Sequence, residues 1–226
     1  MKIYNLCKIF FICIFMFLCL YIDANAHISN TNKIILIDPG HGGIDGGAVS
    51  RNKTLEKDLN LEISMKLKEV LENKGYKVFM TRESDVSLSN GGSVKQQKRD
   101  DLNKRCSMKR EVSCDVFVSI HMNKFSDNSV RGSQVWYPFY SEKSKKLAEN
   151  MHKQFEQVLN QKYNRKPKGV KNDYVILRDG YEGASVIVEC GFISNDEEEH
   201  KLKDESYQYE FCNSLGRAID DYFNGR

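Results

Sequence analysis

Short apolar segments alternate with helical segments along almost the whole chain after residue 27, and this alternation constrains the fold more than any other feature. Six short runs, several rich in β-branched and aromatic residues, are typical of strands buried on both faces of a sheet; they are residues 33–37, 77–81, 116–120, 134–137, 174–177 and 186–190. Apolar residues recur at helical spacing between them, in residues 59–71, 143–163 and 206–223 and more weakly in the charged segment 95–111. This order predicts an α/β domain whose sheet is mostly parallel, with right-handed crossovers. Residues 84–94 (SDVSLSNGGSV) are polar and contain glycine, so we expect an exposed loop there.

The first 26 residues have the composition of a secretory signal rather than of a folded segment. Lys2 and Lys8 accompany an uncharged apolar run over residues 9–22, and Ala24-Asn25-Ala26 follows with small residues at the two positions that a signal peptidase reads. A membrane span needs about 20 apolar residues, which exceeds this run. We therefore predict a signal peptide over residues 1–26 and one exported domain over residues 27–226. An uncleaved anchor is the alternative, and it also places the domain outside the cytoplasm.

The net charge limits the kinds of partner that this chain is expected to bind. The formal net charge is only +3, so nothing indicates nucleic acid or an anionic lipid surface as the partner. No integral membrane domain is predicted beyond the signal segment.

Four cysteines follow residue 27, and their spacing does not match a zinc knuckle; they are Cys106, Cys114, Cys190 and Cys212. Buried thiols are expected, and the sequence predicts no particular disulfide.

Three of the predicted strands end in side chains that can bind a metal or move a proton. His41 follows the first run in the stretch IILIDPGH, His121 follows VFVSI, and Glu189 closes VIV. In an open parallel sheet the carboxyl ends of the strands share one edge, where ligands bind. A single histidine after a strand is usually an ordinary loop residue, but a glutamate at the end of an apolar strand needs a charge or a metal as its partner. Together the three residues predict a site at this edge.

Two imidazoles suit a catalytic zinc ion, which usually has three protein ligands and one open position. We expect the third ligand to be a carboxylate close in sequence to His41. Glu56 lies in the first turn of the helix that follows, at the same edge of the sheet. Its other interpretation is a favourable interaction with the helix dipole, worth about 0.3–1 kcal/mol. Asp58 and Glu62 are competing carboxylates, and spacing alone does not exclude them.

Five segments resemble the successive motifs of the zinc-dependent N-acetylmuramoyl-L-alanine amidases, in the order in which that family carries them. They are residues 37–47 (IDPGHGGIDGG), 56–61 (EKDLNL), 81–82 (TR), 117–123 (FVSIHMN) and 186–195 (VIVECGFISN). The resemblance extends from about residue 33 to residue 223. Several motifs in order are far more specific than any one of them.

The resemblance implies a fold, a reaction and a role for each site residue. It implies a six-stranded mixed sheet with helices on both faces, and hydrolysis of the amide bond between N-acetylmuramic acid and L-alanine in peptidoglycan. His41, Glu56 and His121 would bind one zinc ion, so Glu56 is selected over Asp58 and Glu62. Such a zinc ion lowers the pKa of water toward ~7, and Glu189 would move a proton from that water to the departing alanine nitrogen.

A narrower resemblance concerns the biological setting. The single short domain and residues 98–105 (KRDDLNKR) are most similar to the germination-specific amidases of spore-forming bacteria. This implies action on spore cortex peptidoglycan, with formation of muramic δ-lactam, and a helper protein is a further expected partner.

Two other classes of function compete with this interpretation. A non-catalytic peptidoglycan-binding protein of the same fold would need a decayed site, but all four positions hold chemically competent residues. A zinc peptidase or sugar deacetylase would keep the metal and cut another bond. The chain contains no H-E-x-x-H motif, which argues against the commonest zinc-peptidase design.

Overall fold

A computed structural model of the chain describes residues 32–157, 159 and 165–226 as one α/β domain around a six-stranded sheet. The strands are β1 (Ile34–Pro39), β2 (Lys77–Met80), β3 (Val116–Asn123), β4 (Gln134–Pro138), β5 (Lys168–Val170) and β6 (Ala184–Phe192). The helices are α2 (Glu56–Asn73), α3 (Val94–Glu111), α4 (Glu142–Gln157), α5 (Asp196–Lys203) and α6 (Glu205–Phe223), with a 3₁₀ helix η1 (Val175–Leu177). The predicted signal peptide and the last part of the predicted helix 143–163 lie outside the described residues.

The strands are ordered β2-β1-β3-β6-β4-β5 across the sheet. Strands β2, β1, β3 and β6 are parallel, whereas β4 pairs antiparallel with β6, and β5 runs parallel to β4. The sheet is therefore mixed and mostly parallel, as expected. The carboxyl ends of β1, β3 and β6 lie at the same edge.

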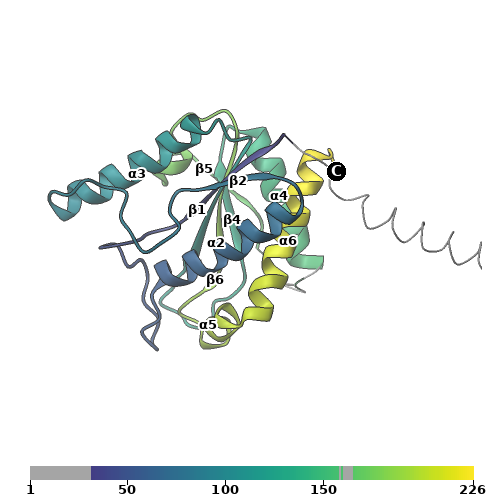
Figure 1. Cartoon of the computed structure of the whole chain (residues 1–226). Coiled ribbons are helices and arrows are strands. Elements are labelled where there is room, and N and C mark those ends of the chain that lie inside the picture. The colour runs from purple at the N-terminus through teal and green to yellow at the C-terminus, as the bar shows by residue number, and fades with distance from the viewer. Residues whose placement is uncertain (1–31, 158, 160–164) are drawn as a thin grey trace, which may run out of the picture.

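Helices cover both faces of the sheet, but unequally (Figure 1). On one face α2, α4 and α6 pack on an apolar layer that includes Ile35, Val118 and Val188. On the other face α3 and η1 pack on a smaller apolar layer that includes Leu36 and Phe117. Adjacent strand residues point to opposite faces, so each strand contributes to both layers. The prediction of helices on both faces is confirmed.

One predicted strand is wrong. Residues 174–177 are not a strand: Tyr174 precedes the 3₁₀ helix η1, and the sixth strand is instead β5, which pairs with β4. Lys109 on α3 is fully buried, and its ammonium group donates a hydrogen bond to the carbonyl of Ile176. Ile176 and Leu177 are buried in the apolar layer beside α3. Burial of a short apolar run does not by itself distinguish a strand from a helical turn.

The short helix α5 was not predicted. It begins after Asn195, whose side chain accepts a hydrogen bond from the backbone N–H of Glu198. An asparagine followed three residues later by a glutamate is a helix-start pattern, so the signal was present in the sequence. Residues 84–93 are irregular and mostly exposed, as expected. Across the described ranges, no helix combines the length and the apolar character that crossing a bilayer requires.

Candidate active site

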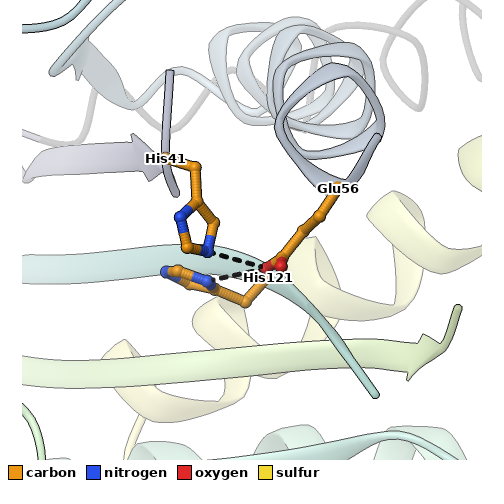
Figure 2. A group of neighbouring side chains, drawn as sticks. All are labelled: His41, Glu56 and His121. Carbon is orange, nitrogen blue, oxygen red and sulfur yellow. Dashed lines mark hydrogen bonds and ion pairs between the residues drawn. The ribbon is translucent and has the colours of Figure 1, made fainter. Parts of the chain in front are cut away.

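Three of the four predicted site residues, His41, Glu56 and His121, converge at the carboxyl edge of the sheet (Figure 2). His41 follows β1, and His121 lies near the end of β3. Glu56 is the first residue of α2, whose N-terminus reaches the same edge. Glu189 on β6 is the direct cross-strand partner of His121.

Three of these side chains bring one ligand atom each to a common point. Nε2 of His41 lies 3.2 Å from Oε1 of Glu56, and Nδ1 of His121 lies 3.0 Å from the same oxygen. The potential ligand atoms of His41, Glu56 and His121 all lie within 4.8 Å of one another. Two imidazole nitrogens and one carboxylate oxygen are a donor set that zinc accepts. The residues present therefore fit a metal ion of this kind.

Two glycines provide the space in which these rings sit. A Cβ on Gly40 would lie 2.3 Å from the ring of His121. A Cβ on Gly47 would lie 2.6 Å from Oε2 of Glu56 and 2.7 Å from the ring of His41, and its φ is +67°. Any other residue at either position would displace a side chain of the site, because real Cβ atoms do not approach so closely.

The two carboxylates around His41 determine its electrostatics. Its Nδ1 pairs with Oδ2 of Asp45 at 2.9 Å, while its Nε2 faces Glu56. Burial, the largest influence, lowers the pKa of His41, but hydrogen bonds to Asp45 and Glu56 together raise that pKa to about 9. A carboxylate on Nδ1 also orients a ring whose Nε2 binds a metal. The same negative groups that favour a proton here thus favour a metal cation in its place.

Glu56 is held from several directions. Its Oε2 accepts a hydrogen bond from the backbone N–H of Ala48 at 2.7 Å, and its Oε1 accepts one from that of Met122 at 3.1 Å. Burial raises the pKa of this carboxyl, but His121 and His41 more than offset the effect, and the pKa falls well below its usual value. Glu56 therefore presents a charged oxygen in a fixed position.

Glu189 differs from Glu56 in its surroundings. It is 9% exposed, and its Oε2 is buried without a hydrogen-bond partner among the described residues. Burial, and secondarily the negative charge of Glu56, raise the pKa of Glu189 to about 7, although His121 and His41 act in the opposite direction. A carboxyl group with a pKa near neutrality can both accept and donate a proton.

The structure separates Glu56 from its competitors. Asp58 and Glu62 are exposed on α2, and neither belongs to the cluster. Sequence reasoning missed Asp45, although it stands four residues after His41 in the first motif, and it gave Arg82 and Arg105 no role. These arginines are 3% and 2% exposed and contact the backbone that carries His41.

A cavity adjoins the two histidine rings on the side of α3 and η1. It is bordered by the loop that follows residue 84 and by the first turns of α3, and its lining includes Ile44, Ser87, Lys98, Leu102 and Ile176. The polar loop 84–94 thus borders the site through Ser87. The cavity thus lies beside the rings of His41 and His121 on the α3 face of the sheet.

Several known proteins similar to this chain are named as N-acetylmuramoyl-L-alanine amidases. A family model described as N-acetylmuramoyl-L-alanine amidase matches residues 35–221. The germination-specific N-acetylmuramoyl-L-alanine amidase of Bacillus subtilis is 33% identical over 195 residues, which cover 85% of this chain and 81% of that protein. The N-acetylmuramoyl-L-alanine amidase AmiC of Escherichia coli is 31% identical over 231 residues, covering 84% of this chain and 52% of that protein. The CwlD amidase from Clostridioides difficile, solved in complex with the GerS lipoprotein, superposes with a TM-score of 0.82 at 37% identity, covering 86% of this chain and 100% of that one.

Proposed function

This chain belongs to the N-acetylmuramoyl-L-alanine amidase family, and we propose that it hydrolyses the amide bond between N-acetylmuramic acid and L-alanine with one zinc ion bound by His41, Glu56 and His121. Glu189 is the proposed catalytic base. The observation that carries the proposal is the convergence of two imidazoles and a carboxylate on one point, beside a buried carboxyl whose Oε2 has no partner among the described residues.

Each residue has a separate task in the reaction. When bound, zinc supplies a Lewis acid that polarises the amide carbonyl and makes water more acidic. Asp45 holds the ring of His41 so that Nε2 faces the metal position. The backbone N–H groups of Ala48 and Met122 fix the carboxylate of Glu56.

Glu189 moves the proton. A pKa of about 7 leaves a large fraction of its carboxylate ready to accept a proton from the attacking water near neutral pH. The protonated carboxyl then donates to the leaving nitrogen of L-alanine, which departs as a neutral amine. Its unpaired Oε2 is not committed to another group of the described residues.

The finer biological setting is also a proposal. The name of the Bacillus subtilis relative supports a role in germination. On spore cortex peptidoglycan, the proposed substrate, this hydrolysis would leave a free carboxyl on N-acetylmuramic acid, the group from which a muramic δ-lactam is formed in a separate step. The complex of that CwlD with a lipoprotein supports a helper protein as a partner of this chain. We place the domain outside the cytoplasm, after a signal peptide over residues 1–26, where the wall is.

The test combines metal content with product analysis. Wild-type protein, His121→Ala and the control His152→Ala are purified, zinc is measured by atomic emission, and digested peptidoglycan is examined by mass spectrometry. His152 is a suitable control because it lies on α4 and pairs only with Glu156 among the interactions described for it. We expect one zinc per chain and new L-alanine amino termini with the wild type and the control, and loss of both with His121→Ala.

Other outcomes would identify the competing functions. New reducing sugars would indicate a glycosidase, and new amino termini inside the stem peptide would indicate a peptidase. Binding to peptidoglycan without any new termini would indicate a non-catalytic wall protein. Unchanged zinc content in His121→Ala would remove that residue from the ligand set.

A further inference from the structure

The backbone that carries His41 has an unusual conformation. His41 has a φ of +61°, in the left-handed region that residues with a Cβ seldom adopt, and Gly42 and Gly43 follow at +133° and +56°. At the end of β1, whose last residue is Pro39, the chain turns, and the carbonyls of residues 39–41 belong to this turn. Buried carbonyl groups need hydrogen-bond partners. The conformation that aims the ring of His41 therefore depends on what these carbonyls contact.

Two buried guanidinium groups contact all three carbonyls. Arg105 on α3 donates from Nη1 to the carbonyl of Pro39 at 2.8 Å and from Nη2 to that of His41 at 2.7 Å. Arg82, after β2, donates from Nε to Pro39 at 3.0 Å and from Nη2 to the carbonyl of Gly40 at 3.0 Å. The arginines thus approach the same turn from two different elements.

Both guanidinium groups are themselves held in place. Arg105 pairs with the carboxylates of Asp38 and Asp101, each at 2.5 Å. Arg82 also donates to the carbonyls of Ser84 and Lys57. The turn fits closely around Arg82, since a Cβ on Gly42 would lie 2.9 Å from its Nε. The carboxylates of Asp38 and Asp101 compensate the charge of Arg105, so that this guanidinium can stay buried.

We propose that Arg82 and Arg105 form a clamp that holds the turn 39–41 in its left-handed conformation and thereby positions His41 to bind the metal. This inference rests on the proposed role of His41 as a ligand. The two arginines are positioning residues, because their contacts go to the backbone of the ligand and not to the reacting groups. The clamp sets how strongly the metal is bound.

Lysine is an informative replacement in the clamp. A planar guanidinium presents five N–H groups in a fixed fork, whereas an ammonium is a single point of donation. Lysine at position 105 would keep the positive charge beside Asp38 but would not reach the carbonyls of Pro39 and His41 together with Asp101. Arg105→Lys and Arg82→Lys therefore test the fork geometry with the net charge unchanged.

The experiment measures zinc affinity by competition with a chromophoric chelator, together with thermal unfolding of the metal-free protein. Partners behind a metal ligand typically change affinity about 10–100-fold, and we expect losses in that range for Arg105→Lys and Arg82→Lys. Arg110→Lys is the matched control on α3. Its guanidinium donates to the carbonyls of Cys106 and Asp179, away from the turn, and its zinc affinity is expected to equal that of the wild type.

A double substitution separates positioning from general destabilisation. In a His41→Ala background the clamp has no ligand to position, so Arg105→Lys is expected to cause no further loss of zinc affinity. An equal loss in both backgrounds, or wild-type affinity in both lysine variants, would overturn the clamp. If a lysine variant does not fold, Asp101→Asn takes its place, because it removes a carboxylate that holds Arg105 and keeps the guanidinium. An equal loss of zinc affinity in both backgrounds, or wild-type affinity in Asp101→Asn, would then overturn the clamp. Wild-type affinity in His41→Ala alone would instead refute the proposed ligand set.

Discussion

The two faces of the sheet are built from the same strands but differ in the polarity of the side chains that those strands place on them. Toward α2, α4 and α6, strands β1, β3 and β6 remain apolar to their carboxyl ends, with Ile37, Ile120 and Val188 in one continuous layer. Toward α3 and η1, strands β1 and β3 begin apolar, at Leu36 and Phe117, and then become polar. On this face β6 carries the apolar Ile187 between two polar residues. The polar positions of β1, β3 and β6 on this second face are Asp38, Ser119, His121, Ser185 and Glu189.

The period of two along a strand explains how both faces are possible. A change from apolar to polar residues at alternate positions builds a site on one face and leaves the packing of the other face intact. The face covered by α2, α4 and α6, called the helical face below, is therefore expected to determine stability. The face covered by α3 and η1, called the α3 face, is expected to determine chemistry. Substitutions on each face test this division.

The largest expected effect comes from Glu189→Gln on the α3 face. Removing a general base typically lowers the rate by about 10²–10⁴-fold, and we expect kcat to fall by that factor. The free energy of unfolding is expected to stay the same or to rise, because a buried carboxyl is replaced by a neutral amide. The measurements are release of L-alanine amino termini, zinc content and a urea unfolding curve. Near-normal turnover would refute the assigned role, and lost zinc would make Glu189 a ligand.

Leu67→Ala on the helical face is expected to lower stability and leave kcat unchanged, the reverse of Glu189→Gln. Leu67 lies in α2 and is fully buried, and truncating such a leucine typically costs about 2–5 kcal/mol of unfolding free energy. At temperatures where the variant is folded, kcat is expected to match the wild type. Met65→Ala is the control, because Met65 is 42% exposed on the same helix and should change stability by less than about 0.5 kcal/mol. A large fall in kcat would show that α2 transmits strain from this face to Glu56 at its N-terminus.

The sequence predicted the elements that follow simple periodicity and the residues that end strands. Parallel strands share an edge, so the convergence of His41 and His121 could be inferred without coordinates. The choice of Glu56 over Asp58 required the family resemblance, because a helix turn alone offers several carboxylates. The structure adds that Asp58 is exposed.

What the sequence did not predict depends on contacts between distant segments. The run at residues 174–177 has strand composition, but a buried lysine from α3 binds the carbonyl of Ile176 and the run becomes a 3₁₀ turn. The contacts of Arg105 with the turn at His41 join residues 64 apart. No local pattern indicates such a contact, because an arginine in a charged helix is usually on the surface.

The smallest expected effect concerns the buried carboxylate of Asp38, and it tests whether polar groups on the α3 face also contribute to stability. Burial raises the pKa of Asp38, but Arg105 and the hydroxyls of Ser119 and Thr81 lower it below its ordinary value. A lowered pKa means that the unfolded chain binds more protons, so this stabilisation is present above about pH 4 and is lost as pH falls below that value. Ser119→Ala removes a donor that lies 2.6 Å from Oδ2 of Asp38.

Losing a hydrogen bond to a buried charged group typically costs about 1–3 kcal/mol, and we expect this penalty for Ser119→Ala in metal-free protein at pH 7. The penalty should shrink as pH falls toward 3, because the variant lacks the donor that favours the charged carboxylate and therefore takes up a proton on Asp38 at a higher pH than the wild type. Ser185→Ala is the matched control, since the Ser185 hydroxyl is buried without a partner among the described residues. Its penalty is expected to be near zero at every pH. Urea unfolding of both variants from pH 7 to pH 3 measures the difference. A penalty for Ser119→Ala that does not vary with pH would mean that this face, like the helical one, is stabilised by packing rather than by the charge of Asp38.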